Sequence, residues 1–204
     1  MYDEKIKEQI IFDFISNYKN SKSSKQNLKV AIKKKIKKDS DVERFISFHF
    51  SDGVETVITD FNHIINHTLD KTLNKSFSSL RTNEKICELI LLRLNNLSRF
   101  KNGLKNLNKF LIKDLKIILI NKLLFKIADQ LWYLAGDKST DFNYYSKRII
   151  LMKVYLLSFN YWLRDNSEDF TKTRIFTENQ IKNVLKFGLL KNNIKNFLKK
   201  RFIF

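Results

Sequence analysis

The sequence of 204 residues contains no proline, only four glycines and a single cysteine. Proline and glycine punctuate the loops of β-sandwiches and α/β domains, and no Gly/Ser-rich linker occurs either, so we predict one all-α domain. Cys87 has no second cysteine in the chain to pair with, which fits a reducing compartment. Because it lies in an apolar helical run, we expect a buried, unreactive thiol.

Long apolar runs are also missing. No stretch of 18 apolar residues occurs, because Lys116, Lys122 and Lys153 interrupt the best candidates, so we expect no membrane span. The opening sequence MYDEKIKEQIIFDF combines acidic residues with an amphipathic pattern. It resembles neither a secretory signal nor an arginine-rich transit peptide, so the chain is expected to stay where it is made.

Acidic residues are scarce, at 21 against 39 lysines and arginines, which gives a formal net charge of +18. This balance favours an anionic partner, either nucleic acid or a lipid surface. Lysines outnumber arginines 31 to 8, and Lys, Asn, Ile and Phe are all abundant, which is typical of an AT-rich genome. The placement of the charge is therefore more informative than its total.

No catalytic constellation can be distinguished from chance. His63 and His67 stand at i and i+4 with Asp60 one turn earlier, but no HExxH motif and no duplicated Glu-x-x-His motif accompanies them. No glycine-rich phosphate loop and no nucleophile with a recognisable base is present. We therefore predict a protein that is not an enzyme and needs no cofactor or metal.

Apolar periodicity predicts helices along most of the chain. Three short helices within residues 1–50 precede a longer one that ends near residue 75, which is how a TetR-type domain begins. Further helices are expected over 83–101, 104–111, 113–135, 140–163 and 165–187, with a last helix after Gly188.

The lysine-rich segment 29–38 lies where a TetR-type fold would place its DNA-contacting helix-turn-helix. Lysines can neutralise phosphates, but base readout usually needs Arg, Asn or Gln side chains. We favour a solvated or membrane-facing basic surface, and nucleic-acid binding and genome bias remain as alternatives.

Residues 129–148, DQLWYLAGDKSTDFNYYSKR, form the most specific stretch of the chain. Gly136 is expected to end one helix with φ > 0. Ser139, Thr140 or Asp141 is expected to cap the next helix. Spacings of three and four then predict a packed face and a separate stripe that is free to bind. The packed face comprises Phe142, Tyr145, Ile149, Met152 and Leu156, and the stripe comprises Asp141, Tyr144, Arg148 and Tyr155. The plainer alternative is a capped helical hairpin whose aromatic residues fill a core.

Residues 132–148 resemble the signature of the coenzyme Q nine family, W-Y-x-A-G-D-x-S-T-D-F-N-W-Y-[ST]-[KR]-R. The resemblance covers roughly residues 120–188, although Tyr144 and Arg174 stand where the family usually has Trp. It implies an all-α, TetR-like domain of about nine helices plus a C-terminal amphipathic helix. The expected division is a single domain over 1–188, with a degenerate helix-turn-helix-like region (1–50) and a lipid-binding body (51–188), followed by a membrane-contacting helix (189–204).

The resemblance also implies a function. Members of the family are lipid-binding accessory proteins of ubiquinone biosynthesis, which present a membrane-embedded isoprenoid quinone intermediate to the di-iron demethoxyubiquinone hydroxylase. The implied location is cytoplasmic, on the inner face of a bacterial inner membrane, or on the matrix side in a mitochondrion. The residues expected to bind the hydroxylase are Asp129, Trp132, Asp141, Tyr144, Tyr145 and Arg148.

Lipid contacts are expected from the apolar helical faces of the body. The candidates are Leu94, Leu115, Ile118, Leu119, Leu123, Ile127, Leu131, Met152 and Leu156. The C-terminal segment repeats apolar residues at spacings of three and four among lysines, without an acidic residue, which favours a helix lying in a membrane interface over one docked on the body. Its expected membrane contacts are Phe187, Leu190, Ile194, Phe197, Leu198, Lys199, Lys200 and Phe202.

The expected partners are therefore an isoprenoid lipid or ubiquinone intermediate, the hydroxylase and an anionic membrane surface. A homodimer stays open, and specific nucleic acid is not expected. Two alternative functions remain from the sequence: a TetR-type DNA-binding regulator, and a helical interaction protein without a ligand.

Overall fold

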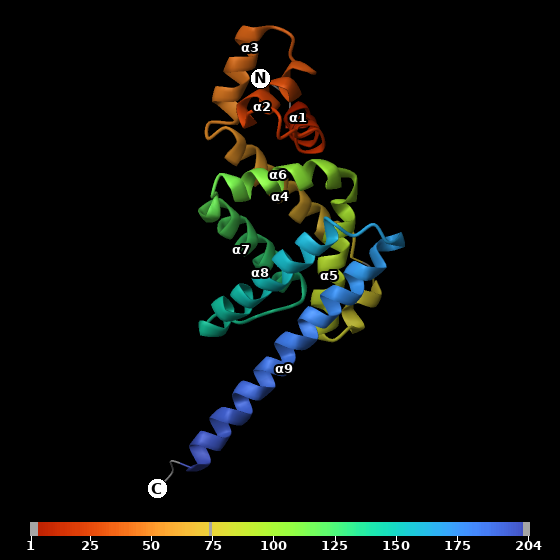
Figure 1. Ribbon diagram of the computed structural model, residues 1–204, viewed down its shortest axis with the longest axis vertical. Helices are drawn as coiled ribbons and strands as arrows, with labels where there is room; N and C mark the ends of the chain where they lie inside the picture. Colours follow the sequence, from red (N-terminus) through yellow and green to blue (C-terminus); the bar gives the residue numbers. More distant parts are fainter. Residues whose placement is uncertain (1–3, 74, 202–204) are drawn as a thin grey trace.

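The computed structural model describes the backbone of residues 4–73 and 75–201 and the side chains of residues 4–73 and 77–186. Within these ranges all regular structure is helical, as predicted (Figure 1). The α-helices are α1 (Glu4–Ser16), α2 (Ser24–Lys33), α3 (Asp39–His49), α4 (Val54–Lys71), α5 (Thr82–Asn96), α6 (Lys101–Lys113), α7 (Ile117–Leu134), α8 (Phe142–Trp162) and α9 (Thr171–Arg201). Short 3-10 turns occur at Lys75–Ser79, Ser98–Phe100 and Glu168–Phe170.

The first three helices form a cap on one end of the body, next to α6 (Figure 1). The apolar face of α1 is buried and includes Ile10, Phe14 and Ile15. At Gly103 of α6 the two helices come very close, because a Cβ atom there would lie 1.7 Å from the carbonyl oxygen of Ile15. Glycine is therefore required at this crossing.

The body consists of α4, α5, α7 and α8, with the first part of α9 packed on α5 and α8 (Figure 1). Helix α7 contributes Ile127, Ala128 and Leu131 to the core, and α8 contributes Leu151 and Tyr155. Arg174, at a position where the resemblance expects tryptophan, ties α9 to α5 through Glu88, with Nη1 and Oε1 2.5 Å apart. None of the described helices is long and apolar enough to span a bilayer.

The predicted break at Gly188 is wrong. Helix α9 continues through this position to Arg201 and extends away from the body (Figure 1). A single glycine costs a helix only about 1 kcal/mol relative to alanine, so it does not by itself end one. The eight side chains predicted to contact a membrane, from Phe187 to Phe202, lie outside the described side chains, so those contacts remain predictions.

Candidate functional site

The hairpin between α7 and α8 is closed by the turn that its sequence predicts. Gly136 has φ +88° and donates its backbone N–H to the carbonyl oxygen of Tyr133 at 3.0 Å. Asp141 caps α8, because its Oδ1 accepts the backbone N–H of Asn143 at 2.9 Å. The left-handed glycine and the N-cap are both confirmed.

A buried ion pair lies inside this hairpin. The guanidinium of Arg148 approaches Asp137, with Nη1 and Oδ2 3.2 Å apart, and both side chains are only 4% exposed. Its Nε also donates to Oδ1 of Asp129 at 2.6 Å. Asp137 further accepts hydrogen bonds from Lys147 Nζ and Ser139 Oγ, each at 2.7 Å. The polar residues of the signature therefore bind one another across the turn.

Two aromatic side chains extend this network. The Tyr144 hydroxyl donates to Asp129 Oδ1 at 2.9 Å, and the Arg148 guanidinium lies 3.4 Å from the centre of the Tyr144 ring. Trp132 Nε1 donates to the carbonyl oxygen of Lys147 at 3.1 Å, which joins α7 to α8 directly. The polar groups of the predicted binding stripe thus form hydrogen bonds within the protein.

The network shifts the pKa values of Asp137 and Tyr144. Burial disfavours the charged form of Asp137, but hydrogen bonds from Lys147, Ser139 and the guanidinium of Arg148 outweigh it and lower its pKa to about 2. The hydrogen bond to the Asp129 carboxylate raises the pKa of Tyr144, because the phenol must stay protonated to donate it. Asp137 is therefore ionised, and Tyr144 neutral, across the physiological range.

The predicted packed face and binding stripe of α8 are wrong at five of their nine positions. Phe142 is 81% exposed and Tyr145 57%, and Ile149 is exposed as well, whereas Arg148 and Tyr155 are buried. The other two residues of the predicted packed face, Met152 and Leu156, are half-buried against the core. The helix itself was predictable from its apolar spacing. It carries apolar residues on both sides, so the side that faces the core depends on the bonds of Arg148 to Asp129 and Asp137.

A small apolar cavity lies between α4, α5, α6, α7 and α8. Its volume is about 120 Å³, below the roughly 300–1,000 Å³ of pockets for drug-sized ligands. Of the predicted lipid contacts, three line this cavity: Leu123, Ile127 and Leu156. A cavity of this size cannot enclose a whole isoprenoid lipid without rearrangement.

One wall of the cavity is polar. Arg93 is buried there, and its Nε lies 3.1 Å from the hydroxyl of Tyr155. Its Nη1 and Nη2 donate to the side-chain oxygens of Asn66 and Asn62, at 2.5 and 2.6 Å. All of these partners are neutral, and no ion pair joins Arg93 to a carboxylate among the described side chains. Sequence reasoning missed this cluster, whose only local signal is an arginine within the apolar run of α5.

The remaining predicted lipid contacts lie elsewhere. Leu94 and Leu131 are packed in the core, Leu119 is buried beside α4, and none of the three lines the cavity. The expectation that Leu115 and Ile118 line the body is wrong, because they are 74% and 87% exposed. Leu115 lies in the turn that joins α6 and α7, and Ile118 lies in the first turn of α7.

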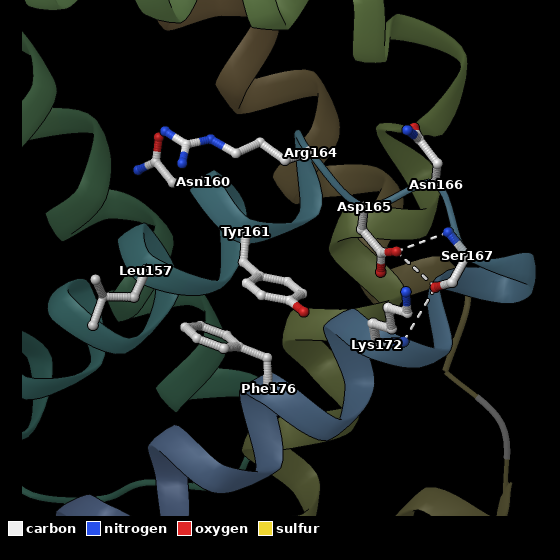
Figure 2. A pocket seen from close by; sticks show the side chains of 9 residues that line it. All are labelled: Leu157, Asn160, Tyr161, Arg164, Asp165, Asn166, Ser167, Lys172 and Phe176. Carbon is white, nitrogen blue, oxygen red and sulfur yellow. Dashed lines mark hydrogen bonds between the residues drawn. The ribbon is translucent and has the colours of Figure 1, made fainter.

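A larger depression lies where α8 meets α9 (Figure 2). Its volume is about 630 Å³, and the stacked rings of Tyr161 and Phe176, with centroids 4.3 Å apart, form one side. Asp165 stands at the other side and accepts hydrogen bonds from Ser167 and Thr173, which lower its pKa to about 2 against the opposing effect of burial. The carboxylate therefore anchors the start of α9, which begins at Thr171 and not at residue 165 as predicted.

Metal-binding and nucleophilic groups are sparse in the described part of the chain. No cluster of three or more His, Cys, Asp or Glu side chains there could hold a metal ion, and His63 and His67 are exposed. Asp60 instead pairs with Lys7 at 2.9 Å. Cys87 is buried, as expected, and burial raises the pKa of its thiol to about 12, which disfavours the reactive thiolate.

The hairpin coincides with a known family region. Residues 119–188 match the model of the COQ9 family. A probable ubiquinone biosynthesis protein coq9, mitochondrial, of Dictyostelium discoideum is 30% identical over 118 residues, which are 58% of this chain and 38% of that protein. The ubiquinone biosynthesis protein COQ9, mitochondrial, of Rattus norvegicus is 27% identical over 153 residues, 72% of this chain and 49% of the relative. The Homo sapiens protein of the same name is 35% identical over 74 residues, 36% and 23% of the two chains.

These matches define a helical protein with the COQ9 region at its α7–α9 end. Over residues 119–188 the chain is similar to the COQ9 family. It spans less than half of the length of each of these curated relatives.

Proposed function

We propose that the protein is a lipid-binding accessory protein of ubiquinone biosynthesis, which presents an isoprenoid quinone intermediate to the demethoxyubiquinone hydroxylase. The observation that carries the proposal is the position of the family region. Residues 119–188 include both a wall of the apolar cavity and the exposed apolar face of α8. One segment thus offers a lipid contact and a protein contact side by side.

The cavity suits one end of an amphiphile. Its leucine and isoleucine side chains match a hydrocarbon chain, and Arg93 offers N–H donors to an oxygen of a head group. A quinone with a long isoprenoid tail is nearly insoluble in water, so a protein that covers part of it lowers the cost of moving it out of the bilayer. The remaining length of the lipid would need the half-buried residues Leu111, Ile120 and Leu123 at the cavity rim to move apart.

The partner surface lies on the outer face of α8. Phe142, Tyr145 and Ile149 recur at spacings of three and four, and all are exposed. Single exposed apolar residues are ordinary, but a stripe of three with two aromatic rings has the composition of an interface anchor. Arg148 and Tyr144, on the opposite side of α8, bind Asp129 of α7. These bonds fix the rotation of α8 and so keep the three apolar side chains exposed.

Charges in the cap weigh against a TetR-type regulator. Three lysines of the basic segment form ion pairs within the cap, namely Lys29 with Glu43, Lys33 with Asp39 and Lys34 with Asp13. Helix α3 has Asp39 and Asp41 in its first turn, and these carboxylates would repel DNA phosphates. The lysines are thus partly neutralised by the protein's own acids.

The test is to extract the purified full chain with organic solvent and identify the lipid by mass spectrometry. A quinone or another isoprenoid supports the proposal, and a protein free of isoprenoid lipid contradicts it. Leu156→Trp should fill the cavity and lower the bound lipid several-fold, because Leu156 lines it. Leu157→Trp is the matched control, since the neighbouring side chain points to the α8–α9 depression instead (Figure 2). Equal amounts of bound lipid in the two variants would show that the cavity is not the lipid-binding site.

A further inference from the structure

The turn between α6 and α7 lies at the edge of the body (Figure 1). Large apolar side chains in this turn and at the adjoining ends of the two helices are exposed. We call this cluster, formed by Ile112, Leu115, Ile117 and Ile118, the apolar turn. All four side chains are more than half exposed, within seven consecutive residues. Contiguous apolar surface of this kind marks a contact with another molecule or with a membrane.

Backbone hydrogen bonds define the conformation of the apolar turn. Lys116 donates its backbone N–H to the carbonyl oxygen of Leu111 at 3.0 Å, and Asp114 donates to that of Phe110 at 2.9 Å. Leu115 has φ +49°, a left-handed conformation that costs a residue with a Cβ roughly 1–2 kcal/mol. Glycine or asparagine would adopt it more easily, yet the position holds a leucine that points into solvent.

The charge around the apolar turn selects the kind of partner. Residues 101–126 contain seven lysines and one acidic residue, Asp114. Lys109, Lys113 and Lys122 are exposed, while Lys116 is paired with Glu55 of α4 at 2.9 Å. Apart from that pair, α4 and the residues before it bring two acids to the nearby groove, Asp52 and Asp60. The balance remains positive, which complements anionic lipid head groups and disfavours contact with a second copy of the same turn.

We propose that the apolar turn inserts into an anionic membrane surface, with the surrounding lysines on the head groups. The combination of an apolar tip and a cationic rim is the one that binds membrane interfaces. Leu111 and Ile120 lie at the base of the turn and also line the apolar cavity, so insertion brings the cavity rim to the lipid. This element is separate from the C-terminal half of α9, and the membrane contact stands whether or not the bound lipid is a quinone.

A fluorescent label can locate the contact in the full chain. Ile118→Cys labels the apolar turn, and Phe48→Cys labels an exposed aromatic position on α3 as the control. Cys87 does not interfere, because it is buried and its raised pKa, about 12, keeps the thiol protonated. With phosphatidylcholine vesicles that contain phosphatidylglycerol, the label at 118 should shift to the blue and be quenched by nitroxides on the lipid chains. The label at 48 should do neither.

A binding measurement complements the label. Leu115→Ser combined with Ile118→Ser should weaken partition onto the same vesicles about tenfold or more, since two apolar side chains no longer enter the interface. Phe48→Ser should leave it unchanged, and pure phosphatidylcholine should bind the parent chain more weakly. The proposal is overturned if the chain binds vesicles while position 118 stays in water, or if the label shifts with protein concentration alone, which would indicate a second copy. Extraction of isoprenoid lipid from the double variant tests the proposed function separately, because it measures bound lipid and not membrane binding.

Discussion

The cap of α1 to α3 and the hairpin of α7 and α8 both use ion pairs, but at opposite degrees of exposure. In the cap, Lys33 and Asp39 pair with side chains that are 52% and 80% exposed. In the hairpin, Arg148 and Asp137 pair with both side chains almost completely buried. An exposed pair contributes roughly 0–1 kcal/mol, whereas removing one partner of a buried pair costs about 3–5 kcal/mol. The cap is therefore held by its apolar core, and the hairpin depends on its polar geometry.

The largest expected effect comes from breaking the hairpin pair. Arg148→Ala should lower the free energy of unfolding by up to about 3–5 kcal/mol, because it removes the buried guanidinium from Asp137 and leaves Lys147 as the remaining cation beside that carboxylate. Chemical denaturation followed by circular dichroism measures the change. A variant as stable as the parent would show that the buried pair does not hold the hairpin.

Acid should weaken the same pair in a defined pH window. The pKa of Asp137 is about 2 in the folded chain, below roughly 3.9 in an unfolded one. A carboxyl group with a lowered folded pKa stabilises the fold above its unfolded pKa and loses this contribution as the pH falls through the folded value. The parent should therefore lose about 2 kcal/mol from this group between about pH 4 and pH 2.

Asp137→Asn provides the comparison for this pH dependence, since the amide does not titrate. The difference in stability between parent and variant should shrink as the pH falls from 4 to 2. A difference that stays constant over this range would mean that Asp137 is not the titrating group.

The smallest expected effect lies in the cap. Lys33→Ala should change the stability by less than about 1 kcal/mol, because the pair with Asp39 is in solvent.

Binding of the parent chain to duplex DNA should be weak, independent of sequence and abolished by moderate salt, as lysine contacts to phosphates predict. Fluorescence anisotropy over a salt series measures it, and a specific complex that survives physiological salt would favour the regulator.

Local features of the fold were predictable because their causes are local. The φ of Gly136 and the cap at Asp141 follow from residues within the turn itself. The end of a helix at Gly188 did not follow, because the preference of one glycine is weaker than the tendency of its neighbours to continue the helix. Sequence thus predicted the elements better than their limits.

The orientation of α8 could not be predicted, because its cause is not local. Arg148 turns inward to acids that lie 11 and 19 residues earlier, Asp137 and Asp129. Leu115 and Ile118 continue an apolar pattern that favours burial, yet both are exposed at the junction of α6 and α7. The polar wall at Arg93 likewise depends on Asn62 and Tyr155, from two other helices.

Two adjacent tyrosines test the central claim, that the polar side of α8 builds the fold and its apolar side binds the hydroxylase. The Tyr144 hydroxyl donates to Asp129, and Tyr145 is exposed beside it. Measuring the stability and the hydroxylase affinity of Tyr144→Phe and Tyr145→Ser separates the two roles. The account predicts that Tyr144→Phe loses about 1 kcal/mol of stability and keeps its affinity. Tyr145→Ser should keep its stability and lose roughly 1–3 kcal/mol of binding. The reverse pattern, with affinity lost at Tyr144 and stability lost at Tyr145, would contradict it.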